Sequence, residues 1–157
     1  MKAKYLNPFL SAANNVIQQF IPDIDIERGE LSAAKSPTES LGVAVFIGIS
    51  GELEGRVIYD MEPSTAINLA SAMNGEDIPE VNDLVRSTLQ ELGNVISGTA
   101  TTNLRQAAES KTIDITPPSM ILGPDTEISD SVQQTLIQVP LETNYGTLVI
   151  NLAVRES

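Results

Sequence analysis

The chain of 157 residues contains no His, no Cys and no Trp. Zinc sites built from Cys and His, thiol nucleophiles, His-based catalytic triads and imidazole general bases are therefore excluded. Disulfide bonds are excluded because they need two Cys residues. Any catalysis by this chain must use carboxylate, amide, hydroxyl or backbone groups.

Positive charge is also scarce, because nine Lys and Arg face 21 Asp and Glu, which gives a formal net charge of −12 at pH 7. Nucleic acids and anionic lipids bind clusters of Lys and Arg, so we expect neither as a partner. The longest mainly apolar stretch, residues 41–49, is far shorter than the roughly 20 residues of a membrane-spanning helix. The N-terminus lacks the charged-then-apolar order of a signal peptide. These features favour a cytoplasmic protein, and the length favours one domain over residues 1–157.

The spacing of apolar residues predicts three helices. Apolar residues recur every three or four positions at 9–20, with Pro8 at the expected entry and Pro22 just after the end. A second helix is predicted over 63–74, because Pro stands at its start and an Asn-Gly pair follows its periodic residues. The longest helical pattern covers residues 79–110.

Two β-rich pairs of segments predict hairpins. Residues 41–60 contain two such runs around Ser50-Gly51, and residues 135–154 contain two runs around Asn144-Tyr145-Gly146. Alternating residues predict further short strands at 24–26, extending toward Leu31, and at 113–115. A loop is expected near Gly123-Pro124. The order helix, strand, hairpin therefore occurs twice.

Short sequence matches between the two halves accompany this repeated order. Asn15-Val16-Ile17 in the first helix resembles 94–96 in the long helix, and Ile24-Asp25-Ile26 resembles 113–115. These matches suggest an internal pseudo-repeat as a hypothesis. The corresponding fold class is α+β, with an antiparallel sheet, helices packed on one of its faces and a pseudo-two-fold relation between the halves.

The long helix has one face that must be buried and one that is polar without being charged. At 100° per residue, an apolar stripe falls within roughly 80°. Its members are Val81, Val85, Leu89, Leu92, Ile96 and Thr99. On the far side Ser87, Glu91, Asn94 and Gly98 form one outward line, named here the Ser87–Gly98 line. No residue between Glu91 and Arg105 is charged, although solvated helix faces usually carry Lys, Arg and Glu.

Two interpretations of this face remain open at this point. Another helix of the same fold or a second subunit packs there, which requires small residues. Alternatively, Gly98 leaves room for a partner protein's active site, into which Glu91 and Asn94 project from a rigid element. Tyr5, Tyr59 and Tyr145 are interface candidates too, although strand tyrosines more often serve as packing residues.

The Glu91 and Asn94 pair offers a limited chemistry. One carboxylate and one carboxamide do not make a metal site unaided, and no calcium-binding loop accompanies them, so we predict no metal bound by this chain. A primary amide donates and accepts hydrogen bonds, so it can hold a water molecule in a defined direction. In-line attack on a phosphoryl group needs such positioning. The carboxylate is free to pair with a cation on the partner.

The spacing around this pair is more specific than Glu-x-x-Asn alone. Ser87, Glu91, Asn94 and Pro117 are separated by three, two and 22 residues, and this pattern resembles the signature of the CheC/CheX/FliY phosphatase family. The segment ELGNVISGTATTNL at 91–104 is also similar to the family's central helix. Pro117 belongs to a Pro pair that by itself predicts a sheet edge or bulge, so we assign it no chemical role.

The resemblance implies a bacterial chemotaxis protein that hydrolyses the aspartyl phosphate of a CheY-type response regulator. It implies that Asn94 enters the regulator's active site and orients water, while Glu91 forms a salt bridge with the regulator's active-site Lys. Ser87 and Gly98 would then contact the partner. The regulator itself would supply Mg²⁺, so no cofactor is expected on this chain.

The resemblance also implies a single active helix. Aligning Asn15 with Asn94 places Ala12 at the position of Glu91 and Pro8 at that of Ser87, so the first helix lacks the motif. This is typical of CheX-like members, which are expected to be homodimers. A non-catalytic receiver-binding adaptor, a flagellar-switch-like component, and a structural homodimer that buries this face remain as alternatives.

Overall fold

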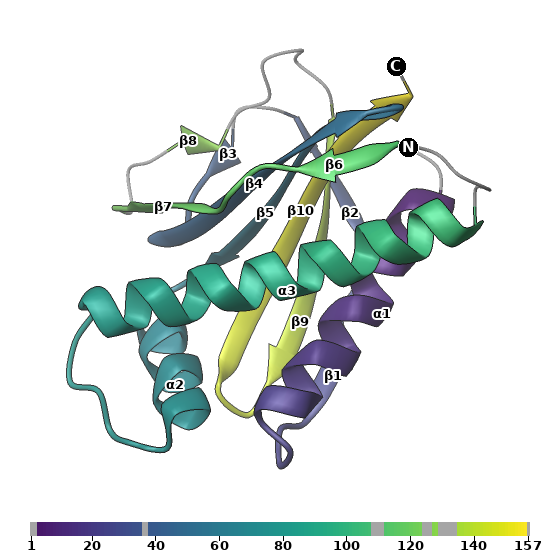
Figure 1. Ribbon diagram of the computed structural model, residues 1–157. Helices are drawn as coiled ribbons and strands as arrows, with labels where there is room; N and C mark the ends of the chain where they lie inside the picture. The colour runs from purple at the N-terminus through teal and green to yellow at the C-terminus, as the bar shows by residue number, and fades with distance from the viewer. Residues whose placement is uncertain (1–2, 36–37, 108–111, 124–126, 129–134, 157) are drawn as a thin grey trace.

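The computed structural model describes residues 3–35, 38–107, 112–123, 127–128 and 135–156. Within these ranges the helices are α1 (Ala3–Phe20), α2 (Pro63–Asn74) and α3 (Asp83–Ala107). Figure 1 shows all of them on one face of an antiparallel sheet, with α3 lying across it and packing against α1 and α2. The α+β fold class predicted from the sequence is therefore confirmed.

The main sheet is antiparallel throughout the described residues. Its strands follow in the spatial order β1 (Ile26–Arg28), β9 (Thr135–Thr143), β10 (Gly146–Glu156), β5 (Leu53–Met61), β4 (Val43–Gly51) and β6 (Ile113–Ile115). Two more edge segments join it, since β2 (Ser32–Lys35) pairs with β9 and β7 (Ser119–Leu122) pairs with β4. A separate pair consists of β3 (Thr38–Glu39) and β8 (Glu127–Ile128).

Both predicted hairpins are confirmed. Strands β4 and β5 pair from Val43 opposite Met61 down to the turn, and β9 and β10 pair up to Thr143 opposite Gly146. The second helix has the predicted bounds, with Pro63 in its first turn and Gly75 in the left-handed conformation, φ 66°, just after its end. These elements follow local turn and cap chemistry, which explains why the sequence alone locates them.

The strand order of the main sheet is symmetric about its central pair, β10 and β5. At the centre β10 pairs with β5, each flanked by its own hairpin partner, β9 and β4. Each of these partners is bordered by a broken edge strand, β1 and β2 on one side and β6 and β7 on the other. This arrangement supports the proposed pseudo-two-fold relation, while the repeat in the sequence stays a prediction.

The starts of two helices differ from the prediction. Helix α1 begins at Ala3 and includes Pro8, which was expected at its entry. Pro8 removes the hydrogen bond to the carbonyl four residues before it and its ring crowds that carbonyl, and the buried apolar side of α1 offsets this cost. Helix α3 begins at Asp83, four residues after Pro79, because the Asn82 side chain accepts a hydrogen bond from the Val85 N–H, at 3.0 Å, and caps it. Its predicted end at Ser110 lies outside the described residues.

The edge strands were predicted in part. Residues 113–115 form β6 as expected, but β1 covers Ile26–Arg28, so only Ile26 of the Ile24–Ile26 triplet lies in a strand. Leu31 lies outside any strand and is 56% exposed. Strands β2, β3, β7 and β8 were not predicted, because they have two to four residues each and pair with distant segments. A loop was expected near Gly123-Pro124. Gly123 follows the end of β7, and Pro124 lies outside the described residues.

The core fills the layer between the helices and the sheet. Strands β4, β5, β9 and β10 alternate, with one set of side chains facing the helices and the other set facing the opposite side of the sheet. Fully buried members of the helix-side core include Phe9, Ile17, Ile47, Leu69, Leu89, Ile96 and Ile150. A smaller buried cluster, Ala44, Ile58, Leu136 and Ala153, lies apart from it. None of the described helices is both long and apolar enough to cross a membrane.

We predict that Asn82→Ala lowers the free energy of unfolding by about 1 kcal/mol, because it removes the cap of α3. Urea unfolding followed by circular dichroism measures the loss. Asn103→Ala is the matched control, since Asn103 is an exposed Asn in the interior of the same helix. Equal midpoints for the Asn82→Ala variant and the unmodified protein would contradict the assigned cap.

Candidate functional site

Helix α3 buries a wider side than the sequence pattern predicted. Four members of the predicted stripe, Val85, Leu89, Leu92 and Ile96, are buried as expected. Val81 precedes the helix and packs against the core while partly buried, whereas Thr99 is only half-buried. The buried side also includes small or hydroxyl-bearing residues, namely Gly93, Ser97, Ala100 and Thr101.

The Ser87–Gly98 line points away from the core. Ser87 and Glu91 are exposed, whereas Asn94 and Gly98 are half-buried. The Ser87 hydroxyl donates a hydrogen bond to the Leu84 carbonyl, at 3.2 Å, in its own helix. The structure therefore places all four predicted site residues along one outward side of a single helix.

Glu91 and Asn94 are free to interact with another molecule. Within the described part of the chain, neither side chain has a hydrogen-bond or ion-pair partner. Residues three apart on a helix lie about 5–6 Å from each other at Cβ, so one partner surface can contact both. Glu91 is also the sole charged residue between Arg86 and Arg105, which leaves its carboxylate without competing charge along this face.

A shallow cavity of about 630 Å³ lies beside Asn94, between α3 and β6. Asn94, Gly98 and Thr102 line it from the helix, and Asp114 lines it from the strand. A Cβ atom added at Gly98 would meet no heavy atom within 4 Å. Open space at this position shows that no described helix of the same chain packs there, so that half of the first interpretation was wrong, while packing of a second subunit on this face stays a hypothesis.

Contacts with the edge of the sheet hold α3 on both sides of Asn94. The Gln90 amide donates to the Pro118 carbonyl, at 3.3 Å, and the Arg105 guanidinium donates to the Ile113 carbonyl, at 2.8 Å. Pro117 is exposed and lies where the edge changes from β6 to β7. The predicted interruption of the sheet edge at this Pro pair is therefore confirmed.

The three tyrosines have different positions. Tyr5 lies on α1 and hydrogen-bonds to Glu156, and Tyr145 lies in the β9–β10 turn with its hydroxyl 3.3 Å from an Asp23 carboxylate oxygen. Tyr59 is buried beneath α3, where its hydroxyl lies 2.8 Å from Ser97 Oγ. This contact between strand and helix was not predicted from the sequence. Small residues on the buried side of the long helix, Gly93 and Ser97, were its signal in the sequence.

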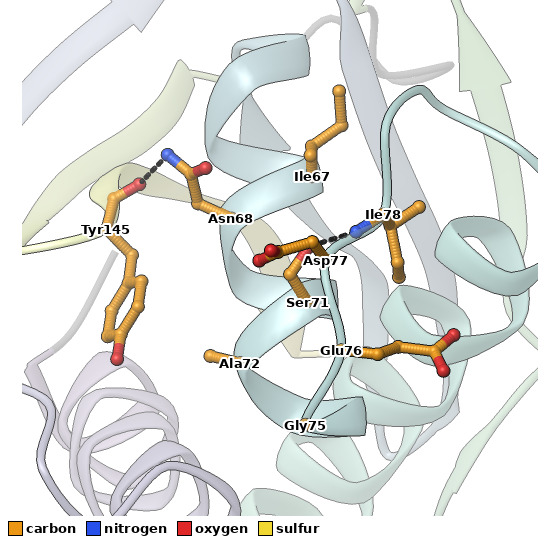
Figure 2. Close-up of a pocket in the computed structure, with 9 residues that line it drawn as sticks. All are labelled: Ile67, Asn68, Ser71, Ala72, Gly75, Glu76, Asp77, Ile78 and Tyr145. Atoms are coloured by element: carbon orange, nitrogen blue, oxygen red, sulfur yellow. Dashed lines mark hydrogen bonds between the residues drawn. The ribbon is translucent and has the colours of Figure 1, made fainter.

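A second cavity, of about 620 Å³, lies beside α2 (Figure 2). Asn68 donates to the Tyr145 carbonyl at 3.2 Å on one side, and on the other the Ile78 N–H donates to Ser71 Oγ at 3.0 Å. Glu76 and Asp77 lie along its rim. No residue of the Ser87–Gly98 line contributes to this cavity, so it is separate from the candidate site. Over the described ranges, no group of three or more carboxylates is arranged to hold a metal ion.

The first helix carries no equivalent pair. Buried positions recur in α1 and α3 at a constant offset of 80 residues, pairing Phe9, Ala12, Ala13, Val16 and Ile17 with Leu89, Leu92, Gly93, Ile96 and Ser97. This offset places Asn14 at the position of Asn94 and Ser11 at that of Glu91, one residue away from the alignment expected from the sequence. Ala12 is buried and is therefore no counterpart of the exposed Glu91. In either alignment α1 has no carboxylate at this position.

Comparisons with known proteins agree with this geometry. The sequence model of the chemotaxis phosphatase CheX family matches residues 43–142. The CheY-P phosphatase CheX of Thermotoga maritima is 30% identical over 129 residues, which cover 82% of this chain and 81% of that protein. A CheC-like superfamily protein from Shewanella sp. PV-4 has a similar structure, with TM-score 0.86 at 22% identity and 99% coverage of both chains. Another similar structure is the CheX of Borrelia burgdorferi in a complex with CheY, BeF3 and Mg²⁺, with TM-score 0.80 and 32% identity, covering 97% of this chain and 98% of that one.

We predict opposite effects of Ala at the two glycines of α3. Gly98→Ala raises the free energy of unfolding by about 0.5–1 kcal/mol, because its Cβ enters open space and Ala favours the helix. Gly93→Ala lowers it, because its Cβ would lie 3.2 Å from both Tyr59 Cδ2 and Val45 Cγ1. Urea unfolding measures both changes. Destabilisation by Gly98→Ala would mean that this side of α3 is not open.

Proposed function

The chain belongs to the chemotaxis phosphatase CheX family, and from this premise we propose that it hydrolyses the aspartyl phosphate of a CheY-type response regulator. The observation that carries the proposal is the outward pair Glu91 and Asn94 on α3, whose side chains have no partner among the described residues. A phosphorylated receiver domain is the substrate, and inorganic phosphate is the product.

Asn94 is the proposed catalytic residue. Its carboxamide hydrogen-bonds to the attacking water and holds one lone pair toward phosphorus, opposite the leaving aspartate oxygen. The water oxygen forms the new bond to phosphorus, the bond from phosphorus to the aspartate oxygen breaks, and the aspartate leaves as a carboxylate. Because the transition state of phosphoryl transfer is loose, positioning this water contributes more than removing its proton early.

Glu91 is the proposed docking residue. Its carboxylate forms a salt bridge with the active-site Lys of the regulator, which places Asn94 over the phosphoryl group. As the sole charge along this stretch of α3, Glu91 fixes where the partner's cation binds. Ser87 and Gly98 contact the partner on either side of the pair, and Gly98 leaves the space that the receiver enters.

The metal chemistry of this reaction belongs to the partner. Charge on the transferring phosphoryl group is neutralised by a Mg²⁺ ion that we propose the regulator supplies, so no cofactor is assigned to this chain. We also propose that the protein acts in the cytoplasm, where chemotaxis regulators signal. The homodimer expected from the resemblance stays a prediction.

We predict that Asn94→Ala lowers the rate of receiver dephosphorylation by roughly 10²-fold, equivalent to about 2.7 kcal/mol of activation free energy, while the fold stays intact. Phosphate release from a purified phosphorylated receiver measures the effect. Asn14→Ala is the matched control, because Asn14 occupies the corresponding half-buried position of α1 and should leave the rate unchanged. Full activity of Asn94→Ala would end the assignment.

The same assay separates an enzyme from an adaptor. An adaptor would bind the phosphorylated receiver, measured by calorimetry, without increasing phosphate release above that of the receiver alone. The proposed phosphatase increases the release catalytically, at substoichiometric amounts of this chain.

Glu91→Ala is expected to raise KM for the phosphorylated receiver, with a smaller effect on kcat, because the pair with Lys contributes mainly to binding. Initial rates over a range of receiver concentrations measure both constants. Glu142→Ala removes the same charge from an exposed position on β9 and controls for net charge. An unchanged KM for Glu91→Ala would remove Glu91 from the docking surface.

A further inference from the structure

The phenol of Tyr59 lies directly beneath the candidate site. Tyr59 is in the middle of the sheet, because it pairs with Val45 of β4 on one side and with Ile150 of β10 on the other. Its side chain faces the helices and is 2% exposed. Strands on both sides therefore hold Tyr59 in place, and a rotation of α3 would not carry Tyr59 with it.

Tyr59 contacts α3 at two points one helical turn apart. Its hydroxyl lies 2.8 Å from Ser97 Oγ, and its ring lies so close to Gly93 that a Cβ there would be 3.2 Å from Cδ2. Gly93 is the residue immediately before Asn94. Two contacts at different heights on one side of α3 can oppose both rotation of the helix about its axis and a shift along the axis.

Small rotations of α3 matter at the tip of Asn94. Side-chain tips lie about 5–6 Å from a helix axis, so a rotation of about 20° moves the carboxamide by roughly 2 Å. A displacement of about 1 Å in a reacting geometry can lower a rate by about 10²-fold. The direction of water attack therefore depends on what prevents this rotation.

Apolar packing alone restrains the rotation less than a directed contact. Leu89, Leu92 and Ile96 pack against other buried apolar side chains, and such contacts have no preferred direction. A hydrogen bond loses strength when its angle or length changes, and a buried hydroxyl without a partner is unfavourable. Burial also raises the pKa of Tyr59, so its hydroxyl keeps its proton near neutral pH and can donate to Ser97.

We propose that Tyr59 is a positioning residue, which through Ser97 and Gly93 fixes the rotation of α3 and so the direction of the Asn94 carboxamide. The inference rests on the proposed function, in which Asn94 orients the attacking water. Tyr59 itself touches neither water nor regulator, since it is buried on the opposite side of the helix.

Tyr59→Phe tests the proposal, because it keeps the ring and removes the hydroxyl. We expect kcat for phosphate release to fall about tenfold, while KM for the phosphorylated receiver stays within about twofold, since Glu91 remains exposed. Ser40→Ala is the control, because it removes another buried hydrogen bond, from Ser40 Oγ to an Asp60 carboxylate oxygen at 2.7 Å, which does not involve α3. It should lower the urea midpoint and leave kcat unchanged.

The double variant Tyr59→Phe with Ser97→Ala separates position from stability. It leaves no hydroxyl without its partner, so its urea midpoint should be higher than that of Tyr59→Phe. Its kcat should remain low, because the restraint on rotation is still missing. Recovery of kcat together with stability, an unchanged kcat in Tyr59→Phe, or an equal loss of kcat in Ser40→Ala would each overturn the positioning role.

A readout that does not depend on catalysis completes the experiment. The side-chain amide signals of Asn94 in a ¹⁵N–¹H spectrum are identified by their loss in Asn94→Ala. They should shift or broaden in Tyr59→Phe and stay in place in Ser40→Ala, and unchanged signals in Tyr59→Phe would contradict the proposal. If they shift but the unmodified protein releases no phosphate, the restraint on Asn94 stands and the proposed phosphatase function fails.

Discussion

The contact of one side of α3 with the sheet determines where the other side of that helix points. Leu89, Gly93, Ile96 and Ser97 are buried against the sheet or its neighbouring helices, so the helix has one orientation. This orientation also sets the outward direction of Glu91 and Asn94, because they lie on the opposite side of the same helical turns. The proposed function therefore depends on how the longest helix packs, and the sheet provides a rigid base for the open candidate site.

Hairpins and helix α2 were predictable from the sequence because their signals are local. Pro63, Gly75 and the turn residues around 144–146 act on their immediate neighbours, and the structure contains these elements where expected. Broken edge strands such as β2 and β7 were not predictable, because their few residues pair with segments far along the chain. Pro8 and Pro79 indicated helix starts that tertiary packing and the Asn82 cap place elsewhere.

Similar reasoning applies to the candidate site. The pair Glu91 and Asn94 could be predicted from the sequence, because the spacing of two residues on one helix is a local property. The structure places both residues outward, as the spacing requires. The role of Tyr59 could not be predicted from the sequence, because Tyr59 lies 38 residues before Ser97 and only the fold brings the two hydroxyls together. Small residues on the buried side of the long helix were the trace of that contact in the sequence.

The most direct test of this account is a crystal structure of the protein with a receiver domain activated by beryllofluoride and Mg²⁺. We expect the receiver to cover α3, with the Asn94 carboxamide within about 3 Å of a water that lies in line with beryllium and the aspartate oxygen. A receiver bound to another surface, such as the cavity beside α2, with Asn94 outside the interface would contradict the account.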